Sequence, residues 1–300
     1  MTSNKPRVGF IGLGLMGHGI AKNLVTKGFP LTVRIHRNRK PAEDILAAGA
    51  KEVKTSAELA RASDVVILCV TGSPQIEEII YGENGIMSAA REGLIVIDTS
   101  TAEPASTAKI REDFAKKGVK YVDAPLARTP KEAEEGRLNT MVGADDATFA
   151  QVKPVLSAYC ENVIHVGPPG HGHMLKLINN FIAQAIATAT AEACAACAKS
   201  GVSIRKLHEI ISAGAVNSGI FQMMVGRMLE GDMAGLKFTL VNAMKDLRYY
   251  THFAESLPVS AIVGEAVHQS LVNANLMGFG DKYVPSLIEA QEKLAGVKII

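Results

Sequence analysis

Residues 7–17 read Arg7-Val-Gly-Phe-Ile-Gly12-Leu-Gly14-Leu-Met-Gly17, and this stretch decides the fold. Val8–Ile11 is an apolar run typical of a buried strand, and His18–Lys27 continues as a helical pattern. The glycine spacing between them suits a tight turn, close approach of backbone N–H groups to a pyrophosphate, and close packing of helix on strand. The stretch therefore predicts a dinucleotide-binding turn, and the alternative is a tight turn without a ligand. The predicted cofactor contacts here are Gly12, Leu13, Gly14, Leu15, Met16 and Gly17.

The same alternation of apolar runs and helical patterns continues to about Gly167. Helical patterns such as Ala57–Ala62 and Ala105–Lys117 separate the runs. Buried β-branched runs punctuated by helices predict an α/β doubly wound sheet, parallel for most of its strands. The further expected strands are Leu31–Ile35, Val65–Val70, Leu94–Ile97, Tyr121–Val122, Met141–Val142 and Val163–Val166.

The pattern changes after Gly167-Pro-Pro-Gly170. Met174–Ser200 predicts one long alanine-rich helix, and the rest shows helical periodicity without convincing strands. Further helices are expected at Lys206–Ser212, Gly219–Leu229, Asn242–Ala254 and Ala261–Asn273. We therefore expect a Rossmann domain over residues 1–167 and an all-α domain over residues 168–300, which includes the long connecting helix. The helices suggest association as a homodimer or homotetramer.

Composition excludes several classes of protein. A net charge of +2 without a block of like charges makes nucleic acid and membrane surfaces poor partners. Four cysteines show neither disulfide-framework density nor a second CxxC pair, and Cys194 and Cys197 are interpreted as core residues of an alanine-rich helix. His171 and His173 lack partners at metal-ligand spacing, so no metal is expected. A polar start and the lack of an apolar run near the ~20 residues that span a bilayer predict a soluble, cytoplasmic protein.

The end of the second predicted strand bears on the choice of dinucleotide. An NAD-binding chain normally ends this strand with Asp or Glu, which binds the ribose 2′-OH. Here the strand runs into Arg34-Ile-His36-Arg37-Asn38-Arg39-Lys40, with no carboxylate before Glu43. Cationic side chains suit a 2′-phosphate, so His36, Arg37, Asn38 and Arg39 favour NADP over NAD. The alternative is a solvated basic turn.

Four motifs occur in order along the chain. They are Gly12-Leu-Gly14-Leu-Met-Gly17, Asp123-Ala-Pro-Leu-Ala-Arg128-Thr129 with its continuation to Gly143, Gly170-His-Gly172-x-x-x-Lys176-x-x-Asn179-Asn180, and Lys245-Asp246-Leu247. With these spacings, nearly the whole chain resembles the β-hydroxyacid dehydrogenase family, which includes 3-hydroxyisobutyrate dehydrogenase, tartronate semialdehyde reductase and sulfolactaldehyde reductase. The resemblance implies an NAD(P)-dependent enzyme that interconverts a small acidic semialdehyde and its hydroxy acid.

The third motif carries the chemistry. On a helix, Lys176 and Asn180 are i and i+4, so both point to one face. Hydride reduction of a carbonyl leaves an alkoxide, which a lysine ammonium can stabilise and protonate; neutral lysine accepts the proton in reverse. Asn180 can donate to the substrate oxygen or hold the lysine. The alternative is a solvated lysine and a surface asparagine.

The resemblance also implies contacts elsewhere. Ser100 and Thr101 would contact the nicotinamide ribose or the substrate, or else serve as turn and N-cap residues. Val70 and Thr71 would wall the cofactor crevice. Asn179 is expected to contact the substrate, and Ser218 either contacts the substrate or caps a helix. Lys245 is expected to contact the cofactor carboxamide or to stabilise the domain interface, and the alternative is an exposed lysine.

One segment departs from most of the family. Where relatives have Ser-Gly-Gly, this chain has Ala127-Arg128-Thr129. It resembles a sulfolactaldehyde reductase there, with Arg-Thr following a small residue. A guanidinium pairs well with an oxyanion, so Arg128 is predicted to hold a carboxylate or sulfonate beside a helix capped by Thr129 and begun by Pro130. The alternative is an arginine paired with an acid such as Glu132 or Glu134.

Two rival functions remain open. Imine reductases resemble this fold and glycine signature, but they usually lack a lysine at the position of Lys176. A non-catalytic dinucleotide sensor would bind cofactor without turning over any aldehyde, and the intact pair of Lys176 and Asn180 argues against it.

Overall fold

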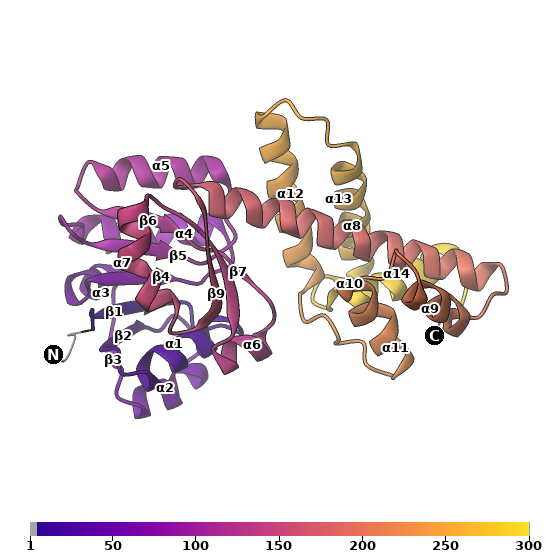
Figure 1. The fold of residues 1–300 in the computed structure, drawn as a ribbon, viewed down its shortest axis with the longest axis horizontal. Coiled ribbons are helices and arrows are strands. Elements are labelled where there is room, and N and C mark those ends of the chain that lie inside the picture. Colours follow the sequence, from indigo (N-terminus) through magenta and orange to yellow (C-terminus); the bar gives the residue numbers. More distant parts are fainter. Residues whose placement is uncertain (1–4, 300) are drawn as a thin grey trace. The chain divides into compact units, whose positions relative to one another are not determined.

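The computed structural model describes residues 5–299, in which the chain forms two compact units (Figure 1). The first ends at Lys176 and contains the sheet, and the second begins at Leu177 and is helical. The predicted fold class, a mostly parallel Rossmann domain followed by an all-α domain, is confirmed.

The sheet of the first unit has the strand order β3-β2-β1-β4-β5-β6-β8-β7. Strands β1 to β6 are parallel, whereas β8 runs antiparallel to β6 and β7 and parallel to β9. The order reverses between β1 and β4, and ligands of such sheets bind outside the carboxyl ends of the strands at this reversal. The strands are β1 (Val8–Ile11), β2 (Leu31–Arg34), β3 (Lys51–Val53), β4 (Val65–Leu68), β5 (Ile95–Asp98), β6 (Lys120–Asp123), β7 (Leu126–Ala127), β8 (Leu138–Gly143) and β9 (Cys160–Gly167).

Helices cover both faces of this sheet. One apolar cluster includes Phe10, Leu24 and Val152, and a second on the opposite face includes Leu59, Val66 and Phe114. Alternate residues of β1 and β4 enter different clusters, as a strand buried on both faces requires. The helices of this unit are α1 (Gly17–Thr26), α2 (Glu43–Ala47), α3 (Ser56–Ala62), α4 (Ser73–Tyr81), α5 (Pro104–Ala115), α6 (Pro130–Glu135) and α7 (Asp146–Leu156), with 3₁₀ turns η1 (Lys40–Ala42) and η2 (Ile86–Ala89).

The second unit packs its own core around the long helix α8 (His171–Lys199), whose first turns belong to the first unit. Ala187, Cys194, Phe221 and Leu247 are buried together in this core. The helices α12 and α13 lie side by side (Figure 1). The helices after α8 are α9 (Ile204–Ala213), α10 (Gly219–Phe221), α11 (Arg227–Leu229), α12 (Leu240–Ser256), α13 (Ile262–Ala274) and α14 (Leu287–Ala295), with π turns η3 (Gln222–Gly226) and η4 (Asn275–Phe279) and the 3₁₀ turn η5 (Val284–Ser286).

Two features of α8 differ from expectation. By length and composition it could cross a membrane, because an 18-residue window reaches a mean hydropathy of 1.4, so the expectation that no run is long enough is wrong. Its apolar character comes largely from alanines, and Ala187 and Ala191 are buried in the core of the second unit. The predicted boundary at residue 167 precedes α8, whereas the compact units divide after Lys176. The reason is that the backbone N–H groups of Gly170 and His173 donate to Asp123 of the sheet.

Candidate active site

The glycine turn after β1 has the geometry that its sequence predicts. Gly12 has φ +109, and a Cβ there would lie 2.1 Å from the carbonyl oxygen of Cys69. A Cβ on Gly17 would lie 1.8 Å from the carbonyl oxygen of Gly12, whereas one on Gly14 would meet nothing within 4 Å. Met16, at the N-cap of α1, makes no side-chain capping bond. The turn is therefore tight and closely packed on α1, with open space at its middle glycine and an uncapped helix N-terminus, which suits a pyrophosphate.

The basic turn after β2 is exposed, but its arginines differ in what they contact. Arg39 donates two 2.8 Å hydrogen bonds to the carboxylate of Glu52, which β3 brings to this turn. Within residues 5–299, Arg37 has neither a hydrogen bond nor an ion pair. The guanidinium of Arg37 is thus available to a ligand, whereas that of Arg39 is already paired.

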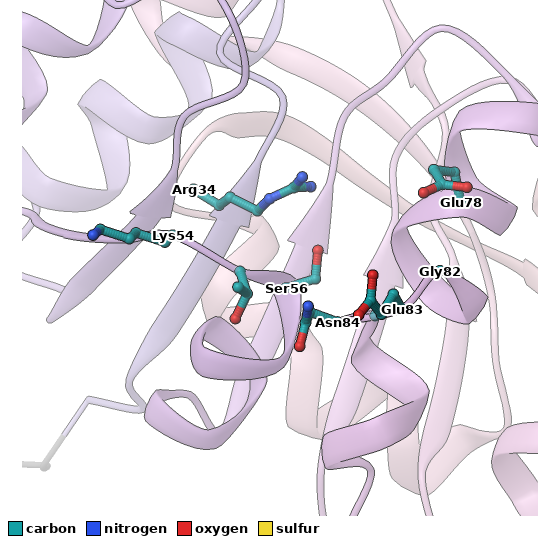
Figure 2. A pocket seen from close by; sticks show the side chains of 9 residues that line it. Arg34, Lys54, Ser56, Glu78, Gly82, Glu83 and Asn84 are labelled. Carbon is teal, nitrogen blue, oxygen red and sulfur yellow. The ribbon is translucent and has the colours of Figure 1, made fainter.

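A polar cavity of about 230 Å³ opens beside the ends of β2 and β3 (Figure 2). Arg34, the last residue of β2, points into it, and its buried Nε atom has no hydrogen-bond partner among the described residues. The sequence places Arg34 at the start of the basic run, but it was not among the predicted cofactor contacts. Besides Arg34, the cavity is lined by Lys54, Thr55, Ser56, Glu78, Gly82, Glu83, Asn84 and Gly85.

Ser100 joins the ends of two central strands. Its Oγ accepts a 3.0 Å hydrogen bond from the backbone N–H of Val70, and its own N–H donates to Asp98 over 2.9 Å. The side chain is almost fully buried at 4% exposure, whereas Thr101 is half-buried. Ser100 therefore stabilises the turn at the strand ends. Among the described residues its hydroxyl donates to no acceptor, so the hydroxyl proton is available to a ligand.

Residues 171–199 form one uninterrupted helix, so Lys176 and Asn180 keep the expected spacing of one turn. Lys176 is half-buried and Asn180 is 8% exposed, so neither is the solvated surface residue of the alternative interpretation.

The second unit connects two motifs that the sequence presented separately. Asn180 donates a 2.6 Å hydrogen bond to Asp246, and Asn179 donates to the amide oxygen of Asn180 over 3.1 Å. The ammonium group of Lys245 lies 2.7 Å from the other carboxylate oxygen of Asp246, with its side chain only 14% exposed. The alternative of a solvent-exposed Lys245 is therefore wrong. Asp246, which lies in the fourth motif but was given no role from the sequence, is the residue that joins the two motifs.

The segment at Arg128 is held by contacts within the protein. Arg128 follows β7 with φ 81, in the left-handed region that favours glycine. Its guanidinium donates to the carbonyl oxygen of Arg137 over 2.6 Å and pairs with Glu161, an acid outside the expected set. These contacts use Nη1 of the guanidinium, and Glu161 neutralises its charge, so an anion bound there would have to compete with Glu161 for that charge.

The caps expected from the sequence are present. Thr129 caps α6, with Pro130 in the first turn, and its backbone N–H donates to the carboxylate of Glu132 over 3.0 Å. Glu132 thus occupies the helix N-terminus that was expected to favour a substrate anion. Ser218 accepts a 3.1 Å hydrogen bond from the N–H of Phe221 and caps α10.

The two cysteines of the long helix differ in burial, since Cys194 is buried and Cys197 is half-buried. Cys194 is fully buried in the second unit, and burial raises the pKa of its thiol to about 12. The interpretation of Cys194 as a core residue is confirmed. Among residues 5–299, no group of three or more His, Cys, Asp or Glu side chains could hold a metal ion.

The fold, the glycine turn and the motif at Gly170–Asn180 together define an NAD(P)-dependent oxidoreductase. Residues 7–167 match the model of the NAD-binding domain of 6-phosphogluconate dehydrogenase, and residues 170–290 match the NAD-binding domain of NADP-dependent 3-hydroxyisobutyrate dehydrogenase. The chain belongs to the β-hydroxyacid dehydrogenase family.

Curated relatives match the chain along nearly its whole length. The 2-(hydroxymethyl)glutarate dehydrogenase of Eubacterium barkeri is 30% identical over 98% of this chain and 97% of its own. The 2-hydroxy-3-oxopropionate reductase of Escherichia coli (strain K12) is 32% identical over 98% of this chain and 99% of its own. The 3-sulfolactaldehyde reductase of the same strain is 28% identical, with 97% of each chain covered.

Solved structures support the fold. The 3-hydroxyisobutyrate dehydrogenase of Salmonella typhimurium superposes with a TM-score of 0.83 at 24% identity, covering 94% of this chain and 99% of that one. An imine reductase from Pseudomonas sp. gives a TM-score of 0.58 at 20% identity, covering 96% of this chain and 99% of that one. The imine reductase is thus the more distant of the two.

Proposed function

We propose that this enzyme reduces a small acidic semialdehyde to its hydroxy acid, reversibly, with Lys176 as the general acid and base. The observation that carries the proposal is the half-buried Lys176, one turn before an asparagine that Asp246 holds in place. The names of the Escherichia coli relatives, a 2-hydroxy-3-oxopropionate reductase and a 3-sulfolactaldehyde reductase, point to the same substrate class.

The residues account for the proton in this reaction. A bound nicotinamide dinucleotide supplies or takes the hydride. Lys176 as an ammonium hydrogen-bonds the carbonyl oxygen, stabilises the negative charge that develops on it and transfers one proton to it. The neutral amine then regains a proton from solvent, and oxidation of the hydroxy acid runs through the same contacts in reverse. Asn180, held by Asp246, has a second amide N–H with which to orient the substrate or the lysine.

For the cofactor, we favour NADP over NAD. The glycine turn would hold the pyrophosphate, and Arg37 would meet the 2′-phosphate at the end of β2. We also propose that Arg34 adds a second cationic group to this end of the site, in a cavity that Lys54, Glu78 and Glu83 line as well. Arg39 contributes less because Glu52 neutralises its charge. His36 and Asn38 are exposed beside Arg37 and could contact the same ribose, and Val70 and Thr71 would wall the crevice.

For the acid end of the substrate, a carboxylate or sulfonate, we propose Ser100 and Thr101 at the end of β5 as the main donors. Ala127, Thr129, Asn179 and Ser218 remain predicted contacts. Arg128 becomes a donor to the substrate only if it leaves Glu161. The homodimer or homotetramer and the cytoplasmic location expected from the sequence stay predictions.

A substrate panel tests the proposal. Three- and four-carbon semialdehydes, sulfolactaldehyde, an uncharged aldehyde of similar size and a cyclic imine are each offered with NADPH and with NADH, and cofactor absorbance is followed. We expect turnover of the anionic semialdehydes, faster with NADPH. Turnover of the imine alone would establish an imine reductase, and cofactor binding without turnover of any aldehyde would establish a sensor.

A further inference from the structure

A cluster of buried polar side chains lies in the first unit, in contact with the backbone of Ser100 and with the first turn of the helix that carries Lys176. It consists of Asp98, Thr107, Tyr121, Asp123 and His173, each no more than 4% exposed. They come from β5, α5, β6 and the first turn of α8. Buried polar groups are costly unless they are paired, so a cluster of this kind calls for a physical explanation.

Asp98 is the acceptor at the centre of the cluster. One carboxylate oxygen accepts the backbone N–H of Ser100 over 2.9 Å, and the other accepts the hydroxyl of Tyr121 over 2.7 Å. Burial and the neighbouring Asp98 carboxylate raise the pKa of Tyr121 well above its usual value, so Tyr121 remains a donor. Asp98 therefore sets the backbone position of Ser100 at the end of β5.

His173 reaches the same carboxylate from the catalytic helix. Its Nε2 lies 3.7 Å from the Asp98 oxygen that accepts from Tyr121, and its Nδ1 lies 2.7 Å from the hydroxyl oxygen of Thr107. The ring is fully buried, and within residues 5–299 Nε2 has no hydrogen-bond partner. In the tautomer whose Nδ1 accepts from Thr107, the Nε2 proton is directed at Asp98 in a polar contact longer than a hydrogen bond. In the other tautomer Nδ1 donates to Thr107, whose hydroxyl donates to the carbonyl oxygen of Glu103 over 3.2 Å. The imidazole thus lies between α5 and the end of β5.

The backbone of His173 is fixed as well. Asp123, at the end of β6, accepts the N–H of Gly170 over 2.6 Å and that of His173 over 3.0 Å. These bonds cap the N-terminus of α8 from the sheet, while the His173 side chain resists rotation of the helix about its axis. Lys176 follows three residues later, about one turn along the same helix.

We propose that His173 is a positioning residue that couples the Ser100 segment, through Asp98, to the direction of Lys176. The inference rests on the proposed role of Lys176 as acid and base. Asp123 fixes where α8 begins, and His173 fixes its rotation, so the ammonium group and the Ser100 hydroxyl keep one relative placement within the first unit.

A different interpretation of the same residues is excluded by burial. A carboxylate, an imidazole and a hydroxyl in sequence also describe a hydrolase triad, with Thr107 as the nucleophile. The side chain of Thr107 is 1% exposed and the imidazole is fully buried, so no substrate can reach that hydroxyl. The arrangement can act only through the backbone that it holds.

Two substitutions of His173 separate its contact with Asp98 from its contact with Thr107. In His173→Gln the side-chain amide lies as far from Cβ as Nε2 does, so it can donate to Asp98. In His173→Asn the amide lies as far from Cβ as Nδ1 does, so it keeps Thr107 and loses Asp98. Because a displacement of about 1 Å can cost up to ~10²-fold in rate, we expect kcat of His173→Asn to fall about ten- to a hundredfold and that of His173→Gln about threefold or less.

The measurement is kcat per cofactor-binding site, with the number of sites and their affinity found by NADPH titration. If His173 had only a structural role, its variants would have fewer cofactor-binding sites or a lower melting temperature but the same kcat per site. An unchanged kcat per site would therefore overturn the proposal. Equal losses in the two variants would overturn it too, since the direction toward Asp98 would then not matter. If His173→Asn does not fold, His173→Leu replaces it, because leucine fills similar space and cannot contact Asp98 through a polar atom. We expect kcat per site of that variant to fall about ten- to a hundredfold, and an unchanged kcat would refute the inference.

Lys176→Ala, measured beside these variants, separates the inference from the proposed function. An active Lys176→Ala enzyme would reject the proposed acid and base, and this inference with it. An inactive Lys176→Ala enzyme together with a fully active His173→Asn enzyme would reject the role of His173 alone.

Discussion

Asn180 donates a 2.6 Å hydrogen bond to Asp246, so a residue of α12 sets the orientation of an amide on the catalytic helix. The same carboxylate lies 2.7 Å from the ammonium group of Lys245 and is 2% exposed. A buried carboxylate between a cation and an amide donor is stable only with both partners present. Asp246 is thus the shared partner of two motifs that lie far apart in the sequence.

Asp246→Asn and Asp246→Ala test this relationship. The asparagine can still accept from Asn180 but loses the charge opposite Lys245, whereas alanine removes both the acceptor of the Asn180 amide and the carboxylate beside Lys245. We expect Asp246→Ala to lose stability by about 1–3 kcal/mol, the penalty for unpaired buried polar groups, and Asp246→Asn to lose less. Urea unfolding measures both. Equal unfolding midpoints for the two variants would show that the hydrogen bond to Asn180 contributes nothing.

Removal of the Lys176 amine tests the chemistry. Lys176→Ala should lower kcat by about 10²–10⁴-fold, the usual contribution of general acid catalysis, and leave the dissociation constant for NADPH nearly unchanged. The matched control is Lys199→Ala at the other end of α8, where the lysine donates to the carbonyl oxygen of Ala295. Comparable rates for the two variants would reject Lys176 as the proton donor.

Arg37 and Arg39 form a matched pair for cofactor choice, since only Arg39 is paired with Glu52. A charged hydrogen bond is worth about 1.5–3 kcal/mol, so Arg37→Ala should lower kcat/KM for NADPH roughly ten- to a hundredfold and spare NADH. Arg39→Ala should change the NADPH preference much less. A wild-type enzyme that uses both cofactors equally would leave this turn as a solvated basic loop.

The contacts of Arg128 support a structural role as the competing prediction to substrate binding. Because Glu161 already neutralises the charge of Arg128 and shares its Nη1 with the carbonyl oxygen of Arg137, we expect Arg128→Ala to reduce activity equally on anionic and uncharged aldehydes. A residue other than glycine costs roughly 1–2 kcal/mol in the left-handed region, so Arg128→Gly should be about 1 kcal/mol more stable than Arg128→Ala. Thermal unfolding and KM for both substrate types check this. A loss confined to anionic substrates would return Arg128 to the acid end of the site.

His18, at the start of α1, makes stability depend on pH. Its ring nitrogens lie 2.5 Å from Glu134 and 3.0 Å from Asp44. Burial alone would lower the pKa of His18, but its hydrogen bonds to these carboxylates outweigh burial and raise the pKa above the usual 6.5. A raised histidine pKa stabilises the fold fully below the unfolded value of 6.5, and that stabilisation disappears as the pH rises through the folded value.

His18→Gln should therefore cost more stability at pH 6 than at pH 9, measured as the difference in free energy of unfolding from the wild type. Burial would raise the pKa of Glu134, but hydrogen bonds from His18 and Lys22 lower it, so this carboxylate stays ionised at pH 6. A cost that is the same at both pH values would show that His18 does not change its charge in this range.

Local patterns made much of the fold predictable. The glycine turn, the buried strands and the helix of Lys176 each follow from spacing within a few residues. β3 and β7 were missed because three and two residues are too short to show a pattern. α4 was readable, since Ile76, Ile79 and Ile80 fall on one face after Pro74, and it was passed over.

The partners of the site residues were not predictable in the same way. The packing of strands and helices determines which residues pair, and residue spacing in a single sequence does not reveal it. Examples are Glu52 with Arg39, Glu161 with Arg128 and Asp98 near His173. The type of chemistry could thus be inferred from residue types, whereas the guanidiniums free for a ligand could be identified only from the structure.

A contact between α1 and α6 joins the cofactor turn to the substrate-side segment. A Cβ on Gly19 would lie 2.4 Å from the carbonyl carbon of Ala133, and the amide of Asn23 donates to the carbonyl oxygen of the same residue over 3.1 Å. The backbone that follows Arg128 is therefore in direct contact with the helix that follows the glycine turn. Substitutions in neighbouring, packed elements do not add, so variants made to change the cofactor and variants made to change the substrate will show epistasis. A change of cofactor specificity near α1 should therefore be tested together with the sequence of α6, and a change of substrate specificity near α6 together with that of α1.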